Sequence, residues 1–136
     1  MQRTVLIGSL SLAMLSCAAP AERAPLPPLP EKVTAMPYAE LLTRARSQAS
    51  LANDAFYVDK WPELEEAARG LEQTSRFLAK ADDVPTKHKD NLTESARALG
   101  KEATKLREAA TAKDVKRATI AMTAINHKVR DLRLAP

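Results

Sequence analysis

The sequence is poor in cysteine, glycine and aromatic residues, and each shortage removes a class of function. Its 136 residues include one cysteine, which excludes an intramolecular disulfide framework, a CxxCH haem attachment and a cysteine-rich zinc or iron–sulfur site. Three glycines argue against a glycine-rich phosphate-binding loop. An aromatic content of 4% is too low for a base-stacking surface, so we expect no nucleic-acid partner. The length allows one domain with a tail.

The sequence also lacks the residue patterns of an enzyme. It contains no Gly-x-Ser-x-Gly motif and no histidine beside an acid that could activate a nucleophile. Four glutamates crowd one segment but lie off its apolar stripe: Glu63, Glu65, Glu66 and Glu72. The first three lie near a helix start, where negative charge is favourable. We therefore expect a non-catalytic protein without a cofactor.

The whole chain has a formal net charge of +4, and basic residues are concentrated in its second half. Such a positive surface could rest against anionic lipid headgroups, peptidoglycan or an acidic protein, and the alternative is a mixed, solvated surface. The residues concerned are Lys87, Lys89, Lys101, Lys105, Arg107, Lys113, Lys116, Arg117, Lys128, Arg130 and Arg133.

The N-terminus has the layout of a signal peptide. Arg3 precedes an uncharged run at residues 4–15, and small residues follow at 16 and 18. The run is too short to span a bilayer, which needs about 20 apolar residues. We therefore expect residues 1–16 to be a targeting segment that is removed.

The end of this segment, Met14-Leu15-Ser16-Cys17, resembles the lipobox of bacterial lipoproteins. Ser16 and Cys17 fit the family pattern, whereas Met14 and Leu15 depart from it. The resemblance implies cleavage before Cys17, a lipid on that cysteine and anchoring in the cell envelope. Because the next residue is not aspartate, it also implies the outer membrane, facing the periplasm. The alternative is ordinary secretion, with cleavage after Ala18.

Residues 17–37 read as a linker that begins at the lipidated cysteine. Proline fixes φ and removes a hydrogen-bond donor, so this stretch should be extended and should hold the following domain away from the membrane. The alternative interpretation is a proline-rich recognition motif at residues 25–28. Six of the nine prolines lie here: Pro20, Pro25, Pro27, Pro28, Pro30 and Pro37.

Residues 38–136 predict an all-α domain, because every long segment repeats its apolar residues at alternating spacings of three and four. Helices are expected at residues 38–57, from Pro62, from about Pro85 and after Asp114, a candidate N-cap. Short joints make consecutive helices antiparallel neighbours, so we predict an up-down-up-down antiparallel four-helix bundle. The stripes are Tyr38, Leu42, Ala45, Ala49, Ala52 and Phe56; Leu64, Ala67, Leu71, Thr74 and Leu78; Leu92, Ala96, Leu99, Ala103 and Leu106; and Val115, Ala118, Met122, Ile125, Val129 and Leu132.

Two glycines lie inside these helices, where each costs up to about 1 kcal/mol relative to alanine. Gly70 and Gly100 both fall beside a leucine of the stripe. We expect that close helix contact is the reason for both.

His88 and His127 are the two candidate metal or haem ligands. On the predicted register His127 lies opposite the core and His88 lies beside the stripe. The two would also lie about 13 Å apart along the bundle at 1.5 Å per residue. A shared metal site is therefore not expected, and we predict solvated surface histidines.

A bundle of this size resembles the cytochrome c′ and cytochrome b562 group, whose last helix carries a histidine followed by an arginine, as in Asn126-His127-Lys128-Val129-Arg130. The resemblance implies the fold. It also implies an alternative function, a b-type haem or metal protein in periplasmic electron transfer or metal handling. Met36 and His127 would then be the ligands, with His88 as a further candidate. Met36 precedes Pro37 and so lies outside the expected helix.

Overall fold

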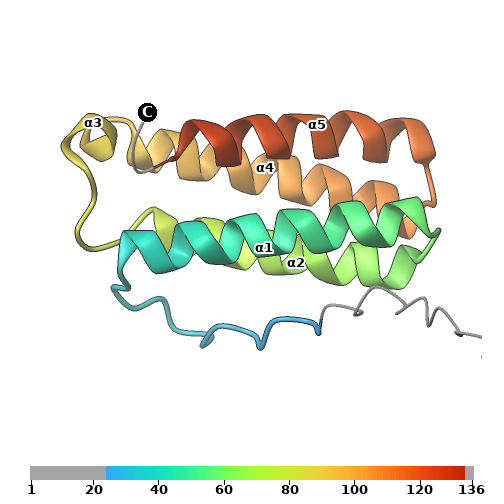
Figure 1. Ribbon diagram of the computed structural model, residues 1–136, viewed down its shortest axis with the longest axis horizontal. Coiled ribbons are helices and arrows are strands. Elements are labelled where there is room, and N and C mark those ends of the chain that lie inside the picture. The colour runs from blue at the N-terminus through green and yellow to red at the C-terminus, as the bar shows by residue number, and fades with distance from the viewer. Residues whose placement is uncertain (1–23, 134–136) are drawn as a thin grey trace, which may run out of the picture.

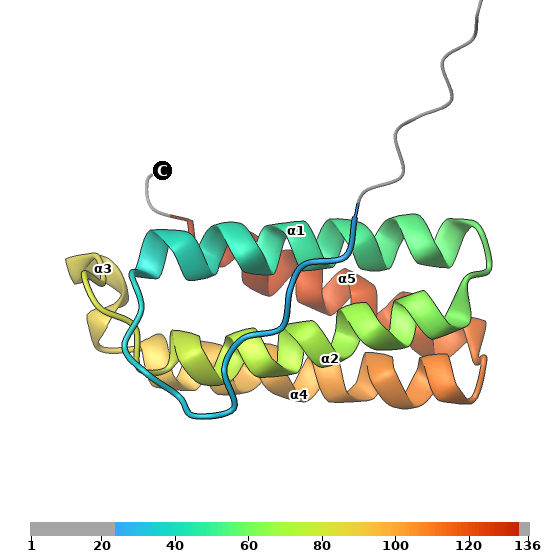
Figure 2. The same cartoon turned by 90° about the horizontal axis from the view of Figure 1, so that it is seen from below.

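The computed structural model describes residues 24–133, and in that range it is helical without any strand (Figure 1). The helices are α1 (Tyr38–Tyr57), α2 (Trp61–Leu78), the one-turn α3 (Thr86–Lys89), α4 (Leu92–Thr111) and α5 (Val115–Asp131). α2 packs against α1 and α4, and α5 packs against α4, whereas the contact between α1 and α5 is smaller. The four long helices therefore form a bundle (Figures 1 and 2). The predicted signal peptide and the lipobox-like residues lie outside the described range.

The predicted stripes form the core of this bundle. Every stripe residue of α2 and α4 is buried, and so are those of α1 apart from Phe56, which is half-buried. One assignment is wrong: Val115 is 56% exposed. It is the first residue of α5, directly after the joint from α4.

Two three-residue joints at the same end of the bundle connect α1 to α2 and α4 to α5 (Figure 1). Both begin with a Schellman motif. Lys113 and Asp114 donate their backbone N–H groups to the carbonyls of Ala110 and Ala109, and Lys113 adopts a φ of 52°. Asp114 then caps α5, because its Oδ1 accepts the backbone N–H of Arg117 at 3.0 Å. The predicted N-cap is thus confirmed.

The third predicted helix, expected to run on from about Pro85, is interrupted in the structure. α3 ends at Lys89, and a turn at residues 90–91 separates it from α4. The break lets α3 lie across the end of the bundle, where His88 stacks on Tyr38 with ring centroids 5.9 Å apart. A continuous helix from Pro85 would hold His88 on the α4 axis, so this tertiary contact accounts for the break.

Tyr38 joins three elements at that end of the bundle. Its ring is fully buried and stacks on His88 of α3, and its hydroxyl donates to the carbonyl of Leu132 at 2.5 Å. Burial raises the pKa of the Tyr38 hydroxyl, and the Arg46 guanidinium offsets part of that shift. The contacts of Tyr38 therefore hold the end of α1 to the end of α5, where the two helices otherwise touch little.

Residues 24–37 are extended, as their prolines predict, but they do not stand free of the bundle. They run across α1 and α2 (Figure 2), and Leu29 is only 9% exposed within the core cluster. At the end of this segment, the backbone N–H of Asp82 donates to the Met36 carbonyl at 2.9 Å, and the N–H of Tyr38 donates to the Asp82 carbonyl at 3.0 Å. The expectation of a free spacer is therefore wrong for this part of the linker, and we call residues 24–30 the strap.

Candidate functional site

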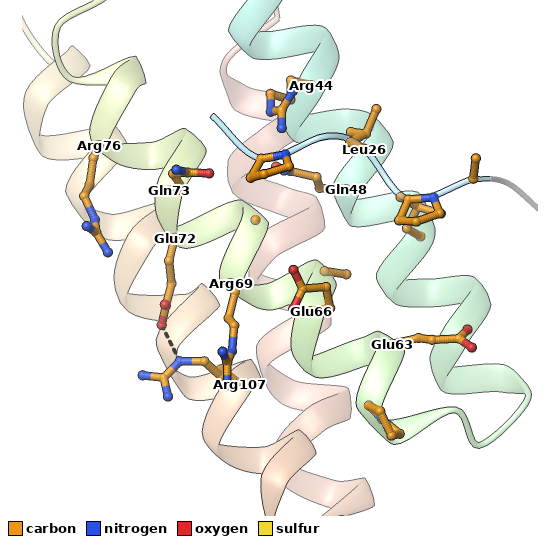
Figure 3. A pocket seen from close by; sticks show the side chains of 17 residues that line it. Leu26, Arg44, Gln48, Glu63, Glu66, Arg69, Glu72, Gln73, Arg76 and Arg107 are labelled. Atoms are coloured by element: carbon orange, nitrogen blue, oxygen red, sulfur yellow. Dashed lines mark hydrogen bonds and ion pairs between the residues drawn. The ribbon is translucent and has the colours of Figure 1, made fainter. Parts of the chain in front are cut away.

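A groove of about 1060 Å³ opens between the strap, α1 and α2, with Arg107 of α4 at its edge (Figure 3). Strap residues form one wall, and α2 contributes most of the remaining lining. The apolar lining includes Leu26, Leu51 and Ala67. We call this hollow the strap groove. Its volume lies slightly above the range of small-ligand pockets, about 300–1,000 Å³.

A buried amide lies in the lining of the groove. Gln48 is 4% exposed, and its Oε1 accepts a hydrogen bond from the buried Thr74 hydroxyl at 2.8 Å. This bond fixes the amide orientation, so Nε2 is the donor that faces Gly70 and the groove. Gly70 leaves room for the amide, since a Cβ there would lie 2.5 Å from Gln48 Nε2. The close contact expected at Gly70 is confirmed, although its partner is a glutamine.

One side-chain amide holds the main chain of the strap. Gln73 accepts the N–H of Leu29 on its Oε1 at 3.0 Å and donates its Nε2 to the Leu29 carbonyl at 2.7 Å. Arg44 adds a hydrogen bond from Nη2 to the carbonyl of Pro27. The bundle therefore holds an extended peptide by its backbone and by one buried leucine.

The groove lining is rich in charge, with four arginines against three glutamates. Arg107 pairs with Glu72 at 3.0 Å and ties α4 to α2 (Figure 3). Arg69 pairs along its own helix with Glu65 at 2.5 Å, and that hydrogen bond raises the pKa of the Arg69 guanidinium. The full charged set is Arg44, Arg69, Arg76, Arg107, Glu63, Glu66 and Glu72.

Arg44 is the least satisfied of these cations. Its Nε is buried and has no hydrogen-bond partner among residues 24–133. Burial lowers the pKa of Arg44, and nearby Glu40 offsets part of that shift. Because a buried donor without a partner is costly, a shift of this side chain that brings Nε to an acceptor would be favourable.

A second, shallower hollow of about 510 Å³ continues from the groove between α2 and α4. It shares Glu72, Arg76 and Arg107 with the strap groove and adds Arg97 and Lys101. Some of the basic residues singled out in the sequence thus lie along one continuous surface over α2 and α4.

The residues predicted as ligands are not brought together in the strap groove. Met36 packs partly buried against the core before α1, and Cys17 lies outside the described residues. His127 is exposed on α5, with its Nδ1 2.6 Å from Arg130 Nη2. His88 is half-buried, stacked on Tyr38, with its Nε2 2.9 Å from the Arg133 carbonyl. The expectation of a solvated His88 is therefore wrong, because that ring packs into the end of the bundle.

The structure of α5 makes His127→Ala a test of the haem alternative. Because the ring is exposed and pairs only along its own helix, the substitution should change the free energy of unfolding by no more than about 0.5 kcal/mol. Chemical denaturation checks this. A loss above about 1 kcal/mol, or a Soret band in protein refolded with haem, would instead favour a role for His127 inside the fold.

The residues that build the groove were missed in the sequence. Leu29, Arg44, Gln48 and Gln73 belong to no motif, and Gln73 meets Leu29 across 44 residues of chain. The available signal was Gly70, whose missing side chain makes room for a group from another helix.

Within residues 24–133 the structure contains no cluster of three or more His, Cys, Asp or Glu side chains that could hold a metal ion. No helix in the same range is long and apolar enough to cross a membrane. Comparison with protein-family models, with curated proteins and with solved structures found no match for the chain.

Proposed function

We propose that the chain is a lipid-anchored protein of the bacterial cell envelope, whose up-down-up-down four-helix bundle binds a protein or another envelope component without catalysing a reaction. The observation that carries the binding role is the strap groove. There the bundle already holds an extended peptide through Gln73 and a buried leucine. A surface that can hold its own chain in this way has the chemistry needed to hold another.

The proposed anchor depends on the sequence Met14-Leu15-Ser16-Cys17 and on the uncharged run before it. A lipid of two or three chains on Cys17 would be a firm anchor, since each buried CH₂ contributes about 0.8 kcal/mol. The proposed location is the outer membrane, with the bundle in the periplasm. Only residues 18–23 would then separate the lipidated cysteine from the strap, which keeps the groove side of the bundle near the membrane.

The non-catalytic role is favoured by what the candidate chemical groups do in the fold. His88 packs on Tyr38, and His127 pairs with Arg130 on the surface. Glu72 is engaged in an ion pair with Arg107. These groups have structural partners, and none of them is a nucleophile aligned with a base.

The anchor is tested by labelling bacterial cells with an alkynyl fatty acid and isolating the protein. We expect label in the wild-type chain and in Ser16→Ala, which keeps a small residue before the cysteine. We expect none in Cys17→Ser, which should also leave the membrane fraction. An unlabelled wild-type protein found in the soluble periplasmic fraction would overturn the anchor.

The binding role is tested in the same cells with a photo-crosslinking residue at exposed positions around the bundle. Glu66 lies at the groove, Lys101 on the α2–α4 surface and Thr123 on α5, on the far side from the strap. A discrete protein adduct from at least one position, reduced in Cys17→Ser, is the expected result. The absence of any adduct from all three would contradict the binding role.

A further inference from the structure

Three surface features of the molecule are not explained by packing of the bundle: the strap groove, the α2–α4 hollow beside it and an apolar tip. The tip comprises the exposed Tyr57, Val58 and Val115, but nothing in the structure shows what would cover it. The groove offers one buried hydrogen-bond donor without a partner among the described residues, four arginines against three glutamates, and an extended segment already bound beside them.

We propose that the strap groove is a binding site for an acidic, extended peptide segment of a partner protein, which lies beside the strap and uses it as one wall. This inference rests on the proposed binding role and names the partner's chemistry. The ligand's carboxylates would reach Arg44 and the cations that line the groove towards α4.

The hydrogen-bond donors in the groove define what a ligand must supply. Arg44 Nε is buried without a partner among the described residues, and the Gln48 amide is oriented by Thr74 with its donor towards the groove. Both side chains come from α1, four residues apart, and so lie on the same face of that helix. The wall opposite them is rich in proline, which has no backbone N–H to offer. A ligand rich in acceptor oxygens therefore matches this groove.

The charges select an acidic ligand. Glu72 is already paired with Arg107, and Arg69 with Glu65. Of the other glutamates in the lining, Glu63 pairs with Lys60, and Glu66 offsets part of the positive charge. Arg76 is exposed where the strap groove meets the α2–α4 hollow, and Arg97 and Lys101 continue the positive surface along that hollow. Complementary charge speeds encounter and suppresses wrong partners, so this surface favours a ligand with several carboxylates.

The strap itself indicates that the ligand is a peptide. Gln73 binds both main-chain groups of Leu29, a contact that any extended residue can make, and Leu29 fills an apolar site. The structure thus holds an extended chain on this surface already. A second copy of the same strap is the weaker candidate, because the first copy occupies its site and still leaves Arg44 Nε without a partner.

The test uses the full-length chain and two synthetic peptides, acetylated and amidated: Leu-Glu-Pro-Glu-Leu-Glu-Pro-Glu and the same peptide with glutamine in place of every glutamate. Isothermal titration at low salt should show the glutamate peptide binding at least about tenfold more tightly than its neutral counterpart. Its affinity should fall as salt is raised, because salt screens exposed charges. Equal affinity for the two peptides, or no binding of either, would overturn the inference.

Matched variants place the binding in the groove. Arg44→Met keeps the aliphatic stem and removes the guanidinium, so it should weaken binding of the glutamate peptide about tenfold, which corresponds to 1.4 kcal/mol. Arg46→Met, on the exposed side of the same helix, should change it less than twofold. Gln73→Ala should weaken binding through loss of the wall, whereas Asn126→Ala on α5 should not. If the two arginine variants behaved alike, the site would lie elsewhere.

The outcome is separable from that of the proposed function. Failure of peptide binding in a chain that still gives a crosslink from Thr123 would overturn only the groove as the site. A concentration-dependent dimer that is lost in Leu29→Ser would assign the groove to a second copy of the chain and overturn the partner. A glutamate peptide that binds the wild type and fails to bind Arg44→Met, with circular dichroism unchanged, establishes the site.

Discussion

Leu99→Asp is expected to unfold the bundle. Leu99 is fully buried in α4, the helix that packs on both α2 and α5. In that position a carboxylate either stays ionised without a partner, or takes up a proton and loses its solvation, and both cost several kcal/mol. The lost leucine packing adds about 2–5 kcal/mol. Because small domains are stable by about 5–15 kcal/mol, the sum is enough to remove the folded state.

The measurement is far-ultraviolet circular dichroism together with fluorescence of Trp61, the single tryptophan. Two variants serve as controls. Lys101→Asp introduces the same side chain at an exposed position of α4 and should keep the helical signal. Leu99→Ala removes only packing and should fold with a lowered denaturation midpoint. A cooperative unfolding transition of normal midpoint in Leu99→Asp would show that the core is not closed around this residue.

The helices could be predicted because the spacing of apolar residues and the capping residues that determine them lie close together in the sequence. The stripe from Leu92 to Leu106 repeats at three and four residues, and burial follows it without exception. Pro62 and Asp114 mark helix starts by rules that need no tertiary structure. Asp114 is the N-cap of α5 as predicted, and Pro62 is the second residue of α2, which begins one residue earlier than predicted. These elements follow from propensity, spacing and capping alone.

The features of the structure that the sequence did not predict depend on contacts between distant parts of the chain. The break after α3 was not predicted, although Asp90 and Asn91, which favour turns and N-caps, stand directly before Leu92. The stacking of His88 on Tyr38 is a contact between distant residues that no local pattern indicates. The docking of the strap depends on Gln73, 44 residues from Leu29, and glutamine is an ordinary residue on a helix surface. Its prolines predicted an extended conformation correctly, but conformation alone does not tell whether a segment is free or bound.

The candidate site was hidden for the same reason. One wall of its groove is a linker segment that is held to the bundle by Leu29 and Gln73, and its one buried donor without a partner among the described residues is Arg44 Nε, which matches no motif. The histidines drew attention in the sequence because histidine is often functional, yet one stacks at the bundle end and the other pairs on the surface. Residue type alone pointed to His88 and His127, whereas the buried Arg44 Nε without a hydrogen-bond partner among the described residues points to the groove.

The contacts of Tyr38 give the second large effect that we expect. Tyr38→Ala should lower the free energy of unfolding by about 3–5 kcal/mol, the usual cost of deleting a buried aromatic ring. Tyr38→Phe keeps the ring and its stacking on His88 but leaves the buried Leu132 carbonyl without the hydroxyl, a loss of about 1–3 kcal/mol. Tyr57→Phe removes a hydroxyl at a side chain that is 83% exposed and should change nothing measurable.

Denaturation of these variants at neutral and alkaline pH separates the hydroxyl from the ring. Because burial holds the pKa of Tyr38 above its usual value, the unfolded chain releases this proton first as pH rises past about 10. The wild type should therefore lose stability above that pH more steeply than Tyr38→Phe, so the gap between them narrows. A gap that stays constant as pH rises would show that the folded state does not raise the pKa of Tyr38. A Tyr38→Phe variant as stable as wild type at pH 7 would instead show that the bond to Leu132 contributes nothing. The end of α5 would then be held to α1 by apolar packing alone.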